Sequence, residues 1–304
     1  LSRSVADRGH VEEALRHSRK AVSIYRQLGR PQFVDFCLIY QTLGLAIARR
    51  PAEAEATMRS LERSGIARSY FMGVDLVLAQ GWVLAAQGNL REARETFRQA
   101  AAEGEHIGDL VGALSALHNI ARIGYPKEVS ARVTDLAGEV EGELAAARRA
   151  HVSALTASEP DVLGVVSVQF ERMGALLLAA EVAADASVAW GRVKDAREKA
   201  SAERRCGWLA ARCPGARSPA LLATESRARL TAAEWEAGQL AACGLSNREI
   251  ADQLMVSIRT VENRLQHVYG KLGVRGRAEL AQVLESIGGP SAESFSAPRS
   301  SSHA

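Results

Sequence analysis

Apolar residues recur at spacings of three and four along most of this 304-residue chain, and this periodicity constrains its fold more than any other feature. Leu90, Ala93, Phe97 and Ala100 form one such series. The spacing places apolar side chains on one face of an α-helix. Alternating Val, Ile and Thr segments and Asn-Gly or Asp-Gly turns, which indicate β-hairpins, do not occur in the sequence. We therefore predict an all-α protein.

A short pattern repeats in the first half of the chain: a turn, then a helix with Ala five positions after the first residue of the turn. Copies begin at Gly9, Arg49 and Gly88, which are 40 and then 39 residues apart, and a fourth begins at Gly191. Two helices per unit of about 34 to 47 residues are typical of tetratricopeptide-like solenoids. We predict such a helical repeat solenoid over residues 1–211. The alternative is a set of helical hairpins that share no true repeat.

The sequence carries no recognisable catalytic or metal-binding pattern. It contains no Gly-x4-Gly-Lys-Ser/Thr phosphate loop, no Gly-x-Ser-x-Gly elbow, no His-x3-His pair and no Cys-x2-Cys pair. His118 and His151 are interpreted as surface or core histidines rather than metal ligands. We expect neither an enzyme nor a cofactor or metal site in this chain.

The composition, with 47% hydrophobic and 24% charged residues, is that of a globular protein. The four cysteines lack regular spacing, which favours the reducing cytoplasm. No run of apolar residues is long enough to span a membrane, and the N-terminus lacks a signal-peptide pattern. The net charge of +3 is too small to indicate a nucleic-acid partner, so a basic surface must be sought locally. Because the chain begins with Leu1 and its first methionine is Met58, we interpret it as a fragment of a longer protein.

Breaks in the helical pattern predict the domain boundaries. Pro214, Gly215 and Pro219 interrupt the pattern within residues 212–226, which we predict to be a linker. A second helical domain is expected over residues 227–287. The Gly-, Pro- and Ser-containing tail over residues 288–304 is expected to be disordered.

The second domain contains two capping boxes, in which a hydroxyl caps a helix and a Glu three residues later reaches back to the capping residue. They are Thr231-Ala-Ala-Glu234 and Ser246-Asn-Arg-Glu249. Ser257 begins a third helix with an apolar stripe, and a last helix is predicted over residues 277–286. The two helices joined by residues 255–257 predict a helix-turn-helix, whose second helix enters the major groove of DNA.

Polar side chains lie opposite the apolar stripe of that second helix. Asn263 and Gln266 are suited to adenine, and Glu262 is suited to cytosine. Five basic residues and one acidic residue lie between Arg259 and Arg277, a local net charge of +4 that suits contact with phosphates. The alternative is a small helical core whose charges are merely on the surface.

Three runs in this segment closely resemble the C-terminal DNA-binding domain of the LuxR family of bacterial transcription regulators. They are Gly244-Leu-Ser-Asn-Arg-Glu-Ile-Ala251, Ser257-Ile-Arg-Thr-Val-Glu-Asn263 and Val268-Tyr-Gly-Lys-Leu-Gly-Val274. The resemblance covers about 57 of the 304 residues. It implies a four-helix domain that binds a two-fold operator in double-stranded DNA as a homodimer and recruits RNA polymerase. The two chains of the dimer would meet at their last helices.

By matched position, the resemblance assigns base reading to Glu262, Asn263 and Gln266. Contact with the DNA backbone is expected from nine further residues: Asn247, Arg248, Ser257, Arg259, Thr260, Arg264, Lys271, Arg275 and Arg277. Two departures stand out: Arg264 replaces a usual His, and Trp235 stands where polar residues are usual. Arg264 can still hold a phosphate because arginine is always charged. Trp235 is expected either to pack locally or to mark an interface.

The helical region is also similar to the large ATP-binding, MalT-like LuxR regulators of actinomycetes. The similarity rests on the run from Phe170 to Glu181 and on the run from Ala211 to Pro219. It implies an ATP site only in a missing N-terminal domain. This chain would then be a regulator whose repeats receive a peptide, a ligand or an interdomain signal.

Two other functions compete with a DNA-binding regulator. A helical-repeat scaffold that binds proteins, with a vestigial helix-turn-helix, is the main alternative. A sigma-factor-like promoter reader is another, but the Gly-Leu-Ser-Asn-Arg-Glu-Ile-Ala run and the lack of other sigma-type regions argue against it.

Overall fold

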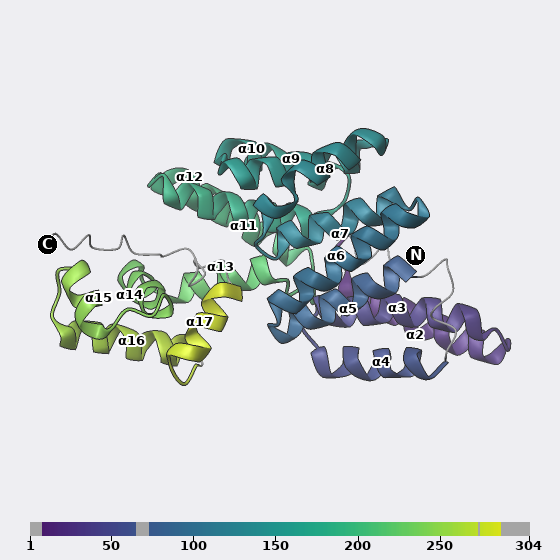
Figure 1. The fold of residues 1–304 in the computed structure, drawn as a ribbon, viewed down its shortest axis with the longest axis horizontal. Helices are drawn as coiled ribbons and strands as arrows, with labels where there is room; N and C mark the ends of the chain where they lie inside the picture. Colours follow the sequence, from purple (N-terminus) through teal and green to yellow (C-terminus); the bar gives the residue numbers. More distant parts are fainter. Residues whose placement is uncertain (1–7, 65–72, 273, 287–304) are drawn as a thin grey trace, which may run out of the picture. The chain divides into compact units, whose positions relative to one another are not determined.

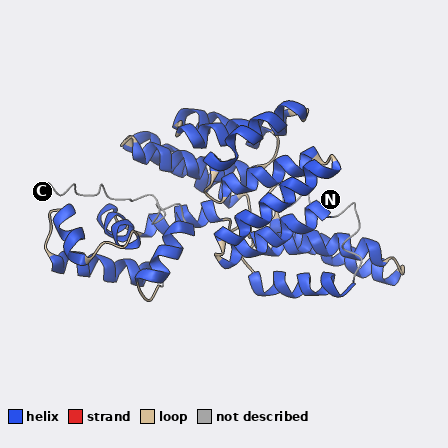
Figure 2. Cartoon of the chain, in the orientation of Figure 1, coloured by secondary structure: helices blue, strands red, loops and turns tan. Residues whose placement is uncertain are grey.

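The computed structural model describes residues 8–64, 73–272 and 274–286, and all regular structure in this part of the chain is helical (Figure 2). The all-α prediction is confirmed. The chain folds into two compact units, an N-terminal unit of residues 1–221 and a C-terminal unit of residues 222–304. None of the helices in the described part is long and apolar enough to cross a membrane.

Eleven helices of the N-terminal unit lie within residues 11–211 of the described chain (Figure 1). They are α2 (Val11–Gln27), α3 (Pro31–Ile47), α4 (Pro51–Ser64), α5 (Gly73–Gln87), α6 (Leu90–Ile107), α7 (Leu110–Arg122), α8 (Pro126–Glu139), α9 (Glu143–Ala157), α10 (Pro160–Arg172), α11 (Leu176–Arg192) and α12 (Ala196–Ala211). Most helices pack on their neighbours in sequence, and α3 also packs on α5. This stacking of helical hairpins is consistent with a repeat solenoid.

The repeated turns share one backbone conformation. Gly9, Arg49 and Gly88 all have positive φ, between 54° and 91°, and a helix begins two residues after each of them. Glycine adopts this left-handed conformation at little cost, whereas Arg49 adopts it against its preference. The Ala residues five positions after these turns are almost fully buried, as expected for closely packed helices.

The fourth copy of the pattern differs from the other three. Gly191 lies near the end of α11, and the residue with positive φ two positions before α12 is Lys194. Ala196, which the pattern predicts to be buried, is exposed. The sequence match at Gly191 is therefore out of register with the structural turn by three residues.

The end of the N-terminal unit packs against its beginning. The backbone N–H of Arg217 donates to the carbonyl oxygen of Ile47 over 2.9 Å. A Cβ on Gly9 would collide with Sγ of Cys213, so only glycine fits this contact. The helical array of this unit is thus closed by contacts between residues about 200 positions apart.

A buried polar chain crosses three helices of the N-terminal unit. Nε2 of His118 on α7 lies 2.9 Å from Nδ1 of His151 on α9, and Nε2 of His151 lies 3.1 Å from Oδ2 of Asp185 on α11. Beside it, Arg122 donates two hydrogen bonds to the Glu181 carboxylate over 2.7 and 2.8 Å. Burial, and then the neighbouring His151, hold the pKa of His118 well below its usual range.

The predicted linker, residues 212–226, contains the start of a helix, α13 (Pro219–Arg229). Pro219 is well suited to begin a helix because its fixed φ and missing N–H fit the first helical position. Cys213 and Ser218 are buried, so the first part of this segment belongs to the packed N-terminal unit. The predicted tail, residues 288–304, lies outside the described residues.

Four further helices form the C-terminal unit: α14 (Ala232–Ala242), α15 (Asn247–Gln253), α16 (Ile258–Leu272) and α17 (Arg277–Ser286). They surround a second, separate hydrophobic core. Its buried members include Ile250 of α15, Leu280 of α17 and the stripe of α16 at Val261, Leu265 and Val268. The four predicted helices of this region are confirmed.

Candidate nucleic-acid interface

Both predicted capping boxes are present in the structure. The N–H of Glu234 donates to Oγ1 of Thr231, and the N–H of Thr231 donates to the Glu234 carboxylate over 2.7 Å. Ser246 and Glu249 make the same reciprocal pair at the start of α15. Each box satisfies helix N–H groups that have no partner within the helix, so the starts of α14 and α15 are fixed by local sequence.

The turn between α15 and α16 is tight and exposed. Met255 has a φ of +50°, and its side chain is 91% exposed. Ser257 then caps α16, because its Oγ accepts a hydrogen bond from the N–H of Thr260 over 3.1 Å. Oγ of Ser257 also lies 2.8 Å from Oγ1 of Thr260, so both hydroxyls predicted to contact the DNA backbone sit together at the start of α16.

Helix α16 has a buried face and an exposed face. Val261, Leu265 and Val268 are at most 4% exposed, which fixes the rotation of the helix on the core. At about 100° per residue, Asn263 and Gln266 then project roughly opposite this stripe, and Glu262 lies beside them. All three predicted base-reading residues are exposed and lie on one helix.

Lys271, at the end of α16, binds back to the start of α14. Its Nζ lies 2.8 and 2.6 Å from the two carboxylate oxygens of Glu234, and Nδ1 of His267 is 3.5 Å from the same carboxylate. The hydrogen bond from Lys271, followed by that from the Thr231 N–H, lowers the pKa of Glu234 to about 2. Lys271 thus holds α16 against α14 in this structure.

Arg277 is also engaged within the C-terminal unit. Its guanidinium donates to the carbonyl oxygens of Ala241 and Leu245, where α14 ends, and over 2.5 Å to Oδ1 of Asn247, where α15 begins. The side chain therefore joins the start of α17 to the connection between α14 and α15. Of the residues predicted to contact the DNA backbone, Asn247 and Arg277 bind each other.

The other basic residues of the predicted set lie at the surface. Arg248, Arg259 and Arg275 are exposed, and Arg264 is half-buried on the flank of α16. The structure thus brings Arg259 and Arg264 onto the same helix as the base-reading residues. Trp235, whose place the sequence left open, is partly buried against the core of the C-terminal unit.

Residues 228–284 match the family described as "Bacterial regulatory proteins, luxR family". These residues form a LuxR-family helix-turn-helix domain. A Mycobacterium bovis protein named as an HTH-type transcriptional regulator is 45% identical over 62 residues, 20% of this chain and 7% of that protein. The Streptomyces halstedii protein GfsR, also named as an HTH-type transcriptional regulator, is 48% identical over 52 residues, 17% of this chain and 21% of that protein.

The matches with these relatives cover a fifth of this chain or less, and the chain spans less than a quarter of the length of either protein. No solved structure is significantly similar to the chain. The LuxR-type helix-turn-helix predicted from the sequence is confirmed, whereas the MalT-like layout stays a prediction.

Sequence reasoning missed two contacts that shape this domain. The Glu234–Lys271 ion pair joins residues 37 positions apart, and the Arg277 contacts with Leu245 and Asn247 span about 30 positions. A weak signal was available for the first, because Glu234 and Lys271 have opposite charges. No local signal marks the second.

Proposed function

We propose that the chain is a sequence-specific, double-stranded-DNA-binding regulator of transcription. The observation that carries this proposal is the exposure of Glu262, Asn263 and Gln266 on the side of α16 that faces away from the core. A recognition helix held in this way presents hydrogen-bonding groups to base edges in the major groove. The names of the two relatives described above agree with a regulator of transcription.

We expect contact with phosphates mainly from Arg248, Arg259, Arg264 and Arg275, because Lys271 and Arg277 are bound within the domain. Arg259 and Arg264 lie on α16, Arg275 lies between α16 and α17, and Arg248 lies on α15. Ser257 and Thr260 add hydroxyls at the positive end of the α16 dipole, which favours a phosphate. Lys271 and Arg277 contribute by positioning helices and by their charge.

The wider organisation is part of the same proposal. Residues 1–211 form the sensing or interaction region, residues 212–226 connect it to the DNA-binding domain over 227–287, and the chain acts in the cytoplasm, at the nucleoid. It binds a two-fold operator as a homodimer, in which the two chains contact each other through α17, and it recruits RNA polymerase. In the full-length protein an ATP-binding domain precedes the helical repeats, as in MalT-like regulators.

Selection from a random pool of duplex DNA tests this proposal. The purified chain is incubated with the pool at physiological salt, and the retained duplexes are sequenced. We expect a two-fold motif to be enriched, and we expect sedimentation to show two chains on each selected duplex. An enriched motif bound by one chain would contradict the proposed dimer but would still support sequence-specific binding.

Absence of any enriched sequence from a folded chain would contradict sequence-specific binding. It would favour the alternative in which the helical repeats are a protein-binding scaffold. A matched control for the selection is the Asn263→Ala and Gln266→Ala double variant, which keeps every core residue of α16.

A further inference from the structure

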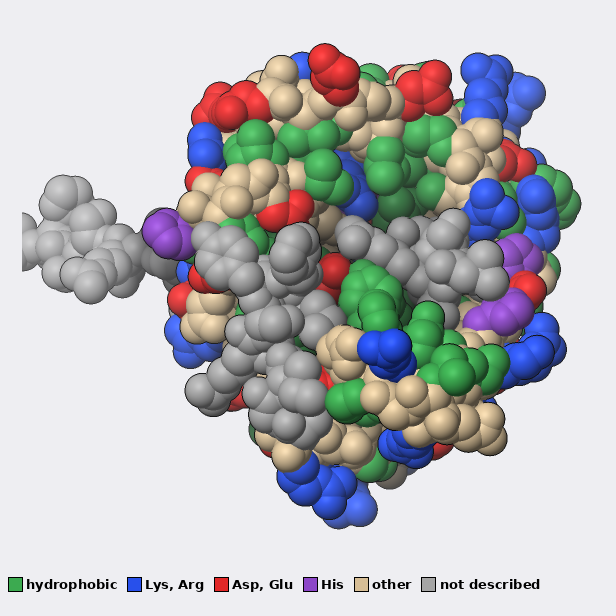
Figure 3. All heavy atoms as spheres, turned by 90° about the vertical axis from the view of Figure 1, so that its right-hand side faces the viewer, with side chains coloured by type: hydrophobic (Ala, Val, Ile, Leu, Met, Phe, Trp, Pro, Cys, Tyr) green, Lys and Arg blue, Asp and Glu red, His purple; other side chains and the backbone are tan. Residues whose placement is uncertain are grey.

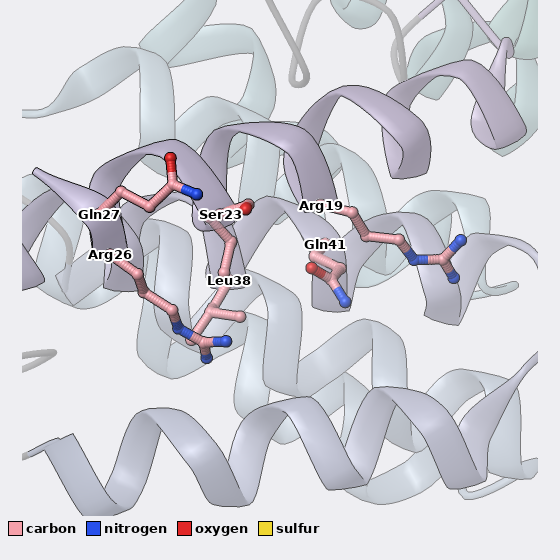
Figure 4. A pocket seen from close by; sticks show the side chains of 7 residues that line it. Arg19, Ser23, Arg26, Gln27, Leu38 and Gln41 are labelled. Carbon is pink, nitrogen blue, oxygen red and sulfur yellow. The ribbon is translucent and has the colours of Figure 1, made fainter.

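An open groove runs along the first two described helices of the N-terminal unit. It has a volume of about 410 Å³, within the range of sites for small ligands and short peptide segments. Val22 and Leu38 supply its apolar lining, and Arg19 and Arg26 of α2 supply its charge. In Figure 4, Leu38 and Gln41 of α3 lie between the two arginine side chains.

Among the residues that line this groove, the charged ones are both arginines. Between Glu13 and Asp35 the chain carries five basic residues and no acidic one; the basic residues are Arg16, Arg19, Lys20, Arg26 and Arg30. On the face drawn in Figure 3, Lys and Arg side chains lie beside hydrophobic side chains, and Asp and Glu side chains are also present. The two arginines in the groove lining are suited to attract an anionic partner.

Acidic side chains also lie close to the groove: Asp35 of α3 is buried one helical turn before Leu38, and Glu53 has a closer partner than the groove. Glu53 of α4 is within the electrostatic field of Arg19, but its carboxylate accepts hydrogen bonds from Arg50 over 2.6 and 2.7 Å. Arg19 and Arg26 are still the only charged residues among those that line the groove.

The distance between Arg19 and Arg26 is close to the distance between side chains three residues apart in an extended peptide. Arg19 and Arg26 are seven residues apart on α2, which is two helical turns, or about 10.5 Å. In a polyproline II segment, side chains three residues apart lie on the same side, about 9.3 Å from each other. Long Arg and Glu side chains easily cover the difference, and Arg can bind a carboxylate with two parallel hydrogen bonds.

The rest of the groove suits the segment between two such carboxylates. A polyproline II backbone makes no internal hydrogen bonds, so its carbonyl oxygens are free to accept from the side-chain amides of Gln27 and Gln41. An aliphatic side chain between the carboxylates can contact the small exposed parts of Val22 and Leu38, which are 7% and 6% exposed. The lining residues include no aromatic ring on which a nucleic-acid base could stack, so a peptide suits the groove better than a single strand does.

We propose that this groove binds an extended acidic peptide segment of a partner protein, with two carboxylates three residues apart and an aliphatic residue between them. Arg19 and Arg26 bind the carboxylates, Gln27 and Gln41 bind the backbone, and Val22 and Leu38 contact the aliphatic side chain. This proposal does not depend on the DNA-binding function, because every residue it uses belongs to the N-terminal unit.

A fluorescence anisotropy titration of the full chain tests the proposal without DNA. The probe is a fluorescein-labelled peptide, Gly-Glu-Leu-Pro-Glu-Gly, in which the residue before Pro favours an extended backbone. The control peptide, Gly-Leu-Glu-Glu-Pro-Gly, has the same composition but adjacent carboxylates. We expect saturable binding of the first peptide and binding at least about fivefold weaker for the second, because only one of its carboxylates meets an arginine.

Substitutions on α2 identify the binding residues. The double variant Arg19→Gln and Arg26→Gln should weaken binding about tenfold, whereas Lys20→Gln, which lies outside the groove lining, should change it less than about twofold. Circular dichroism establishes that each variant keeps its helices.

Three results would overturn the proposal. They are no saturable binding up to about 1 mM peptide, equal affinity for the two peptides, and equal losses for the double variant and Lys20→Gln. Tighter binding of phosphatidylglycerol vesicles than of peptide, lost in the double variant, would assign the groove to a lipid surface instead.

Discussion

Glu234 takes part in two contacts whose partners lie far apart in the sequence. It completes the capping box of α14 with Thr231, and its carboxylate also binds Lys271 at the end of α16. Local sequence predicts the first contact, because Thr and Glu three residues apart form a known motif. It does not predict the second, because Lys271 is 37 residues away and meets Glu234 only when the helices pack. The apolar stripe of α16 sets its rotation, and the Lys271–Glu234 contact adds a link to α14 that no local pattern encodes.

Replacing Glu234 by Gln separates these two contacts. Gln can still complete the capping box, but it cannot form the ion pair with Lys271. Because the pKa of Glu234 is lowered to about 2 by folding, its carboxylate stabilises the domain above about pH 4.5, and this stabilisation is lost as the pH falls from 4.5 towards 2. We expect Glu234→Gln to lower the thermal midpoint at pH 7 and to flatten the acid dependence, measured by circular dichroism.

Glu249→Gln is the matched control for this experiment, since Glu249 completes the other capping box at an exposed position. A loss of stability at pH 7 as large as that of Glu234→Gln would show that the ion pair with Lys271 contributes nothing beyond capping.

Arg264 is expected to act on the DNA backbone rather than on bases. It lies on the flank of α16, next to the core stripe and away from Asn263 and Gln266. Arg264→Ala should therefore weaken binding to selected and to random duplexes alike and reduce the slope of log affinity against log salt by about 1. Titrations at several salt concentrations measure this slope. A loss confined to the selected duplex would instead make Arg264 a base-reading residue.

At the scale of helices, local sequence determines where elements begin but not which buried groups meet. The starts of α14, α15 and α16 follow from their capping residues, and α2, α4 and α6 follow their repeated turns. His118 and His151, however, are 33 residues apart on separate helices, and nothing in their spacing predicts a shared hydrogen bond. The helix within the predicted linker was missed because Pro219 indicates both a break and a helix start.

The buried histidine chain should make the stability of the N-terminal unit sensitive to acid. His118 faces His151, with Arg122, Arg148, Glu181 and Asp185 nearby on the same three helices. Because folding lowers the pKa of His118, only the unfolded chain takes up its proton just below pH 6.5. The free energy of unfolding should then fall by at most about 1.4 kcal/mol per pH unit for this group as the pH decreases below 6.5.

Urea unfolding of the His118→Gln variant between pH 5 and 8 measures this effect. The variant should show a flatter pH dependence than the wild type. Identical slopes for His118→Gln and the wild type would rule out His118 as the titrating group.

At the scale of the molecule, two separate hydrophobic cores stabilise the two units. One core fills the N-terminal unit, and the other is built from α14 to α17 and residues next to them. The sequence predicts this division through its change from a repeat pattern to capping boxes and a helix-turn-helix. It does not predict that residues 213–217 return to the first helices of the N-terminal unit, because that closure joins positions about 200 residues apart.

Because the cores are separate, a cavity made in one core should destabilise that unit and leave the other unit unchanged. Leu265→Ala removes a side chain that is 4% exposed in the C-terminal core and should cost about 2–5 kcal/mol there. Hydrogen exchange should accelerate in α14 to α17 and stay unchanged in α5 to α7. Leu114→Ala, in the N-terminal core, is the reciprocal control and should produce the opposite pattern. Equal acceleration of both units by either variant would show that they unfold as one.

The most direct test of base reading by α16 is the affinity for a selected duplex and for its scrambled version. It is measured for the wild-type chain and for a variant that lacks the side chains of Asn263 and Gln266. The wild type should prefer the selected duplex, and Asn263→Ala with Gln266→Ala should lose about 1–3 kcal/mol of binding per lost base contact on that duplex only. The affinity for the scrambled duplex, which rests on phosphates, should be unchanged. Equal losses on both duplexes would contradict base reading by α16.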